Sequence, residues 1–317
     1  MMKLNERAWQ FLQAHKDKTE ELGIFLSEAT CGTQLFDCGV HAPGGLGAGW
    51  LMAAVGMSGL GTVTLEMSPA SGQPWTWFLV QSDHPLEACY LSQAAHWAVM
   101  EVGYHAMGSG PACLLNRELQ VGAEFGQVEE STHAVLVLEA PALPGEAVCR
   151  SLAAACRVDP ANLAVLVAPT ASLAGSAQIA SRAVETALHK LHHSGFDLRR
   201  VASASGRCPL APPAASDLLA LGRTNDMVFL ASSVCLFLRV APDEVLARLV
   251  EQLPASRSPA YGKPFLQVLK DAGGFYQVDP GLFAPAEVTL VSLSSGASFH
   301  AGALDEARLA QLFRGVA

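Results

Sequence analysis

The chain has 317 residues, of which 50% are hydrophobic and only 15% are charged, and its formal net charge is -9. A typical soluble domain carries about 25% charged residues, so the shortage of charge predicts that another subunit covers part of the surface. The acidic balance and the lack of a Lys/Arg cluster exclude a nucleic-acid footprint and a basic membrane-binding face. Residues 1–18 mix charged and apolar residues, which argues against a signal peptide and predicts a cytoplasmic protein.

The first half of the chain predicts short strands between helices. A first helix is expected over 5–22, where Trp9, Leu12 and Leu22 recur on one side and Gly23 ends the pattern. The other elements expected in this half are strands at 24–27, 61–66 and 76–80, a helix that begins near Pro85, and an inner strand at 133–138.

A long segment between Asp37 and Glu66 carries no charged residue. Pro43 and eight glycines interrupt it, so it predicts a buried, glycine-rich turn region and not a membrane span. Within it, Gly44–Gly49 offers GxGxG where a dinucleotide site needs GxGxxG after a strand. Close backbone packing is therefore favoured over nicotinamide binding, which remains a rival hypothesis.

Two prolines and a glycine at 140–145 mark the predicted boundary between two lobes, at 1–144 and 145–317. Beyond it we expect helices at 146–156, 176–193, 216–221, 242–253 and 305–313, and strands at 163–167, within 226–240 and, as a pair, within 287–299. This alternation predicts a mixed α/β fold, α+β in a strict classification, with two α/β lobes. The layout allows the chain to cross between the lobes more than once.

Arg182 and Glu185 are i,i+3 neighbours on the helix predicted after the strand at 163–167. A carboxylate held beside a guanidinium can position a water molecule and take its proton. Exposed ion pairs at this spacing are common and contribute little to stability. Spacing by itself therefore leaves a catalytic pair and a solvated surface pair both open.

Small residues at Ser109-Gly110 and Gly175-Ser176 let the backbone approach a ligand, but they also form ordinary turns. Ser176 can in addition cap the helix that carries the Arg/Glu pair. The eight cysteines form no CxxC pair and are expected to stay reduced and buried. Three histidines near a helix end, His189, His192 and His193, favour a capping or surface role over metal binding, and no metal site is predicted.

An ordered set of short segments resembles the methenyltetrahydromethanopterin cyclohydrolases. The segments are Gly108–Pro111, Leu138–Ala140 with Leu143–Glu146, Thr224–Asp226, Tyr261–Phe265 and Phe283–Glu287. No single segment is specific, whereas their order is, and the resemblance extends from Asp37–Val40 to the Phe283 segment. It implies reversible hydrolysis of 5,10-methenyltetrahydromethanopterin to 5-formyltetrahydromethanopterin in one-carbon metabolism (formaldehyde oxidation, methylotrophy).

The resemblance also implies a homotrimer, a pterin cleft between the two lobes, no metal and no permanently bound cofactor. Glu185 would be the base that activates water, with Arg182 orienting it and Glu139 as a second acidic pocket residue. Without the resemblance, Glu139 is a strand-end carboxylate paired with a backbone N–H. The implied substrate contacts are Ser109, Gly110, Thr170, Ser172, Ser176, Asn225, Asp226 and Phe283.

Other interpretations of these residues remain open. Asn225 and Asp226 can form a turn before a strand, and Phe283 can be a core residue. Ala94 stands where archaeal members of the family carry a lysine, which favours the dephospho form of the carrier, with fewer negative groups on its tail. The alternative function is a non-catalytic reduced-pterin binding or carrier protein on the same fold.

Overall fold

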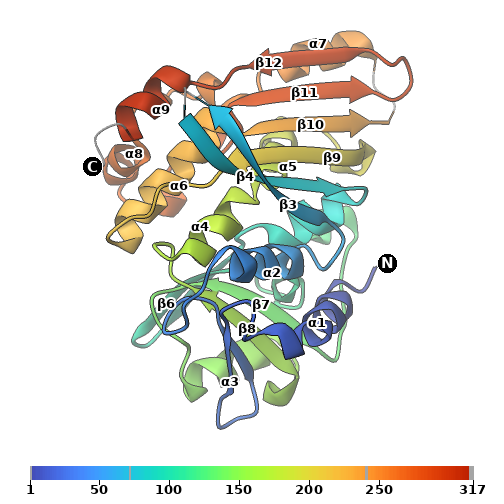
Figure 1. The fold of residues 1–317 in the computed structure, drawn as a ribbon. Coiled ribbons are helices and arrows are strands. Elements are labelled where there is room, and N and C mark those ends of the chain that lie inside the picture. The colour runs from blue at the N-terminus through green and yellow to red at the C-terminus, as the bar shows by residue number, and fades with distance from the viewer. Residues whose placement is uncertain (1, 71–72, 240–241, 314–317) are drawn as a thin grey trace. The chain divides into compact units, whose positions relative to one another are not determined.

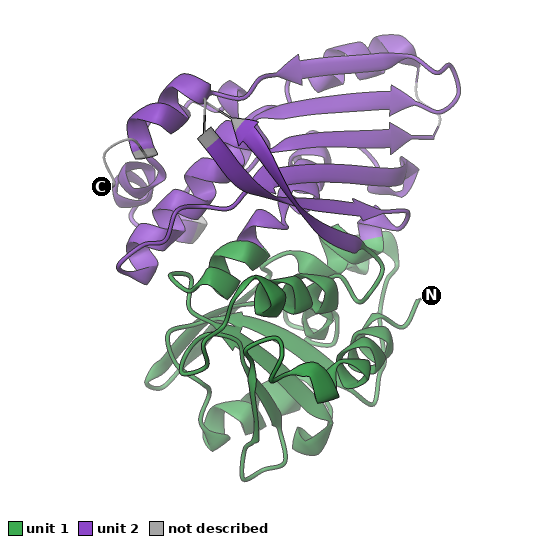
Figure 2. Ribbon diagram, in the orientation of Figure 1, with its two compact units in different colours: residues 1–61, 87–178 green, residues 62–86, 179–317 purple. Residues whose placement is uncertain are grey.

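The chain forms two compact units, each built on one six-stranded sheet (Figures 1 and 2). The computed structural model describes residues 2–70, 73–239 and 242–313. Unit 1 comprises residues 1–61 and 87–178, and unit 2 comprises residues 62–86 and 179–317. Helices and strands occur in both units, so the predicted mixed α/β fold is confirmed.

The predicted boundary between residues 144 and 145 falls inside unit 1. The Pro/Gly segment there is the loop that joins β7 (Ala134–Glu139) to α3 (Glu146–Cys156). Helix α3 buries Val148, Cys149 and Leu152 in the same apolar cluster as the strands of this sheet. Because that packing holds both sides of the loop in one core, the chain changes unit elsewhere, near residues 62, 87 and 179.

Unit 1 has a sheet of strand order β1-β2-β8-β7-β6-β5, in which β2, β8 and β7 are parallel neighbours. Its elements besides β7 and α3 are α1 (Leu4–Ala14), β1 (Phe25–Glu28), β2 (Gln34–Asp37), α2 (Leu46–Gly56), the π-helical segment Leu86–Gln93, β5 (Trp97–Glu101), β6 (Tyr104–Ser109), β8 (Leu163–Ala168) and α4 (Leu173–Ala180). Helices cover both faces of this sheet.

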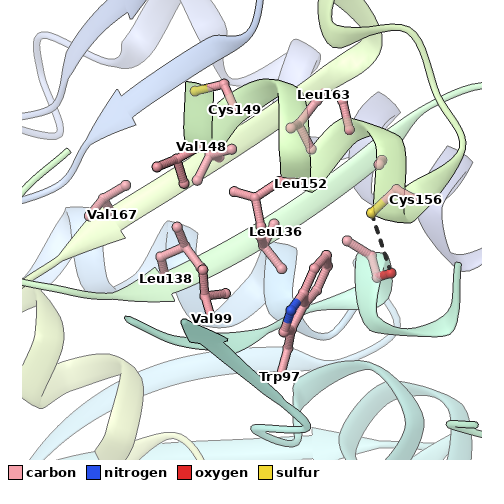
Figure 3. Packing of buried hydrophobic residues seen from close by; sticks show 14 of the residues in the cluster. Trp97, Val99, Leu136, Leu138, Val148, Cys149, Leu152, Cys156, Leu163 and Val167 are labelled. Atoms are coloured by element: carbon pink, nitrogen blue, oxygen red, sulfur yellow. Dashed lines mark hydrogen bonds between the residues drawn. The ribbon is translucent and has the colours of Figure 1, made fainter. Parts of the chain in front are cut away.

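Alternate residues of the central strands of unit 1 enter two different cores. Leu136 and Val165 pack with Leu152 of α3 on one face. Figure 3 shows Leu136 and Leu152 in this cluster. Val137 and Leu166 pack on the other face with α1, α2 and Ala174 of α4. All six residues of β8 are buried, which explains why this strand reads as an unbroken apolar run.

Unit 2 has a sheet of order β12-β11-β10-β9-β4-β3, in which β10 and β11 are parallel neighbours. Its elements are β3 (Thr62–Ala70), β4 (Gln73–Ser82), α5 (Ala183–His193), β9 (Val201–Pro209), α6 (Asp217–Ala231), β10 (Ser233–Leu238), α7 (Asp243–Val250), α8 (Phe265–Ala272), β11 (Glu287–Ser292), β12 (Ser298–Gly302) and α9 (Glu306–Phe313).

The sheet of unit 2 is buried on one face. Strands β10 and β11 alternate strictly between buried and partly exposed residues. Helix α5 lies against the buried face at Gly206 of β9, where an added Cβ would stand 3.0 Å from Val184 Cγ2 and 3.1 Å from Val234 Cγ2. Helix α7 packs beside β11 and β12. The absence of a side chain at Gly206 therefore lets the start of α5 approach the sheet closely.

Two predicted elements near the N-terminus differ from the structure. The first helix ends at Ala14 and not at Leu22, because the following residues 16–21 are mostly charged and offer no apolar face to extend it. The uncharged segment is not a turn region throughout, since its residues 46–56 form α2. Ala, Leu and Met dominate that stretch, and they are strong helix formers. Gly49 within it allows close packing, because an added Cβ would lie 2.4 Å from Ala177 Cβ.

Two predicted elements in the second half also differ. The single helix expected at 176–193 is two helices, α4 and α5, separated at Ser181 and Arg182. The strand expected from Asp226 onward begins only at Ser233, because α6 continues to Ala231. Val240, the predicted end of that segment, lies outside the described residues.

Candidate active site

Glu139 is the last residue of β7, at the carboxyl ends of the three parallel strands of unit 1. It is paired in register with Ala168, the last residue of β8, and it lies two residues beyond Val137, on the sheet face that α4 covers. The loop after β8 and the start of α4 therefore lie next to its side chain. Functional side chains commonly gather at this edge of a parallel sheet.

A tight turn after β8 carries the predicted contacts Thr170 and Ser172, and the helix that follows it, α4, carries Ser176. Ser172 Oγ donates a hydrogen bond to the Pro169 carbonyl at 2.7 Å and accepts one from the Gly175 N–H at 2.9 Å. Ser176 Oγ donates to the Thr170 carbonyl at 3.2 Å. Ser176 is thus inside α4 and holds the turn; the prediction that it caps the helix carrying Arg182 and Glu185 was wrong, because the chain breaks between the two helices.

Both carboxylate oxygens of Glu139 accept hydrogen bonds from side chains. Thr170 Oγ1 donates to Oε1, and Gln178 Nε2 donates to Oε2 at 3.2 Å. Thr170 and Gln178 are 5% and 4% exposed. Two of the partners of Glu139 are thus buried side chains of the turn after β8 and of α4. Sequence reasoning missed Gln178, which lies on α4, 39 residues after Glu139.

Arg182 and Glu185 stand at the start of α5, in unit 2. Arg182 is the N-cap residue and Glu185 lies in the first turn. Glu185 is only 9% exposed, which excludes the solvated surface pair. Burial raises the pKa of Glu185 from its ordinary value of 4.5 to about 7, against the opposing charge of Arg182. A carboxyl with this pKa can exchange a proton near neutral pH.

Asn225 and Asp226 lie on α6, which excludes the alternative interpretation that they form a turn before a strand. Asn225 Nδ2 donates to the Leu221 carbonyl at 2.8 Å. Asp226 Oδ1 accepts the N–H of Phe265, the first residue of α8, at 2.8 Å. Burial raises the pKa of Asp226 to about 7, and the Phe265 N–H bond opposes that rise. This carboxyl therefore joins α6 to the start of α8.

Phe283 belongs to an aromatic cluster in unit 2. Its ring centroid lies 5.2 Å from that of Phe275, 5.8 Å from that of Phe229 and 5.9 Å from that of Phe265. Phe283 itself is partly exposed. The predicted contacts Asp226 and Phe283 are thus brought together through Phe265, which bonds to the first and packs against the second.

Ser109 and Gly110 lie where β6 leaves the sheet of unit 1. Ser109 is paired in register with Val137 and its Oγ donates to the Val137 carbonyl at 3.5 Å. Gly110 has φ +94°, and an added Cβ would lie 3.2 Å from the Val135 carbonyl oxygen. These small residues thus meet a backbone requirement, and Ser109 sits two register positions from Glu139 on the same strand pair.

A further acidic residue at this edge was not predicted as functional. Asp37 ends β2, and its carboxylate accepts four backbone N–H groups, those of Gly39 and Val40 at 2.9 and 2.7 Å and those of His41 and Ala42 at 2.8 and 3.1 Å. It fixes the loop beside the end of β8. The sequence signal that could have identified Asp37 was an acidic residue directly after the apolar residues Leu35 and Phe36.

Two other kinds of feature, a metal site and a membrane-spanning helix, are absent from the residues that the structure describes. Over 2–70, 73–239 and 242–313, no three His, Cys, Asp or Glu side chains are grouped so that they could hold a metal ion. Within the same ranges no helix has the length and apolarity needed to cross a membrane. Six of the eight cysteines are buried, as predicted, while Cys31 and Cys235 are partly buried.

Comparison with known proteins gives the class of the chain and then its family. A family model described as Cyclohydrolase (MCH) matches residues 3–313. The methenyltetrahydromethanopterin cyclohydrolase of Methanospirillum hungatei JF-1 is 38% identical over 304 residues, 95% of this chain and 96% of that protein. The proteins of that name from Methylobacillus flagellatus and Methanocorpusculum labreanum are each 38% identical, covering 94% and 97% of this chain and 91% and 97% of their own lengths.

The chain therefore belongs to the methenyltetrahydromethanopterin cyclohydrolase (MCH) family. The family resemblance inferred from the ordered motifs is confirmed, and the match covers both units.

Proposed function

We propose that this chain reversibly hydrolyses 5,10-methenyltetrahydromethanopterin to 5-formyltetrahydromethanopterin in one-carbon metabolism, with Glu185 as the base. Membership of the family supports the reaction. The observation that carries the residue assignment is the burial of Glu185, which raises its pKa to about 7 beside Arg182. General bases work best when their pKa lies near the operating pH.

The methenyl bridge is a delocalised amidinium cation whose carbon is already electrophilic. Water attacks this carbon, and the Glu185 carboxylate takes one proton as the tetrahedral carbinolamine forms. One C–N bond then breaks, and the remaining proton of the attacking water leaves the hydroxyl group as the formyl C=O forms. The departing nitrogen takes up one proton and becomes an N–H. The net reaction consumes one water and releases one proton. Arg182 keeps the Glu185 carboxylate oriented, and Glu139 stabilises the cationic carbon or relays the proton.

The remaining predicted contacts hold the substrate in this proposal. In unit 1 they are Ser109, Gly110, Thr170, Ser172 and Ser176, and in unit 2 they are Asn225, Asp226 and Phe283. Positioning of one water molecule against the bridge carbon supplies much of the rate. The main task of these contacts is therefore to orient the flat cation. The hydrogen bonds around Thr170 and the ring cluster around Phe283 give these residues fixed positions.

Turnover and binding of the methenyl pterin test the base. Loss of methenyl absorbance is followed with wild type and with Glu185→Gln, which we expect to lower kcat by about 10²- to 10⁴-fold while the dissociation constant changes little. Glu244→Gln is the matched control, because Glu244 occupies the first turn of α7 but is exposed. Tight binding without hydrolysis by wild type would favour the carrier protein. Full activity of Glu185→Gln would refute the assignment of the base.

We further propose that the carrier is the dephospho form. Ala94 is 2% exposed in unit 1, and the family resemblance implies a lysine at this position in archaeal members, whose ammonium group a negative tail would attract. Wild type should therefore bind the dephospho form more tightly than the phosphorylated form. Equal affinities for the two forms would refute this preference.

We also propose a cytoplasmic homotrimer with no metal and no permanently bound cofactor. The low content of charged residues, 15%, supports coverage of some surface by other copies. Light scattering after gel filtration should give the mass of three 33.3 kDa chains. Activity should survive removal of metals by chelation. A monomeric mass, or loss of activity that added metal restores, would refute these two proposals respectively.

A further inference from the structure

Glu139 is held by two side chains that belong to one segment of unit 1. Thr170 lies in the turn after β8 and Gln178 lies on α4, and each donates to a different oxygen of the Glu139 carboxylate. The two donors are eight residues apart, so the turn and the helix contact the end of β7 at the two oxygens of the Glu139 carboxylate. A carboxylate with both oxygens engaged has little freedom to rotate.

The segment that carries the two donors is itself fixed. Gly175 admits no side chain, since an added Cβ would lie 2.0 Å from the Pro169 carbonyl oxygen. Helix α4 packs against α2 at Gly49, where an added Cβ would lie 3.0 Å from the Ala174 carbonyl oxygen. The Ser176 hydroxyl also binds the backbone of Thr170. Side chains on such a rigid support can position a reactive group accurately.

The chemistry of the two donors suits the ionised state of Glu139. An ionised carboxylate only accepts hydrogen bonds, whereas a protonated carboxyl must also donate one. A hydroxyl and an amide NH₂ are neutral donors that satisfy the ionised form without adding a competing positive charge. Because the methenyl pterin is a cation, an ionised carboxylate held in place would attract it and its transition state.

We propose that Gln178 and Thr170 are positioning residues that hold the Glu139 carboxylate ionised and in one orientation toward the cationic substrate. This inference rests on the proposed function, in which Glu139 contacts the methenyl pterin. Neither donor has to touch the substrate for this role. Gln178 was assigned no function by the sequence motifs.

Matched variants test the role in turnover. Thr170→Val keeps the shape and removes the hydroxyl, and Gln178→Leu removes the amide; each should lower kcat/KM about tenfold, as expected for loss of a hydrogen bond to a charged group. Thr170→Ser should restore most of the activity. In a Glu139→Gln background the same two changes should have less than about twofold effect, because their target carboxylate is gone. Equal effects with and without Glu139 would overturn the proposal.

A second measurement does not depend on turnover. Glu139 is labelled with ¹³C in its carboxyl group, assigned with Glu139→Gln, and titrated by NMR. Thr170→Val and Gln178→Leu should each raise the pKa of Glu139 by about one pH unit, since they remove donors to the charged form. An unchanged pKa would overturn the inference. If wild type fails to hydrolyse the methenyl pterin, the proposed function fails while this titration still decides whether the two residues hold Glu139.

Discussion

The sheets of the two units bury their strands differently. In unit 1, β8 has all six residues buried because helices cover both faces of the sheet. In unit 2, β11 buries only every second residue, and its other face stays partly exposed. The comparison shows that the pattern of buried and exposed residues along a strand depends on how many faces of its sheet are covered. Parallel pairing does not by itself predict a fully buried strand, since β10 and β11 are also parallel.

The two units also present their carboxylates differently. Glu139 ends a strand and accepts hydrogen bonds from two neutral donors, an environment that suits the ionised form. Glu185 begins a helix, is buried beside Arg182 and has its pKa raised to about 7. In the proposed reaction the first holds a fixed charge and the second exchanges a proton. The two carboxylates therefore lie in environments that suit different tasks.

The largest expected effect follows from the covered sheet of unit 1. Leu136→Ala removes a fully buried side chain that packs below α3 (Figure 3) and should cost about 2–5 kcal/mol of unfolding free energy. Leu79→Ala makes the same change on β4 of unit 2, where the side chain is partly exposed, and should cost about 1 kcal/mol or less. Urea denaturation of both variants measures the difference. Equal costs would show that another subunit covers the face of unit 2.

A slightly smaller effect concerns the buried charge of Glu185. Its pKa is about 7 when folded and 4.5 ordinarily, so the folded state binds the proton more tightly and loses stability as pH rises from about 4.5 to 7. Glu185→Gln removes this cost and should stabilise the protein by up to about 3 kcal/mol at pH 8. The gain should fade toward zero near pH 4.5. A gain that is the same at both pH values would contradict the assigned pKa.

The smallest effect concerns the turn that places Thr170. Gly175→Ala would force a Cβ against the Pro169 carbonyl and should cost about 1–3 kcal/mol, with a parallel loss of turnover. Gly56→Ala is the control, because an added Cβ in this last residue of α2 meets nothing within 4 Å. That change should be neutral or stabilise the helix by about 0.5–1 kcal/mol. Thermal melts and turnover of the two variants test the turn, and an unaffected Gly175→Ala would show that the turn can relax.

Local pattern predicted much of the fold. The helix at 146–156 was predicted with the bounds that α3 has, and the strand at 163–167 is one residue shorter than β8. Both carry clear apolar periodicity and clear ends. The break between α4 and α5 was not predicted, because Ser181 and Arg182 include neither proline nor glycine. The extension of α6 through Asn225 and Asp226 was missed because its support comes from elsewhere, including the N–H of Phe265.

By itself the sequence determined the family and much of the alternation of helices and strands, because motif order and apolar periodicity are local and readable, and through the family resemblance it predicted the residues that the proposed chemistry needs. Only the tertiary structure decided which of these residues meet. It placed Gln178 against Glu139, Phe265 in contact with both Asp226 and Phe283, and Glu185 in a largely buried position. Hydrogen bonds and pKa values depend on neighbours and burial that distant parts of the chain supply, and no local pattern encodes them.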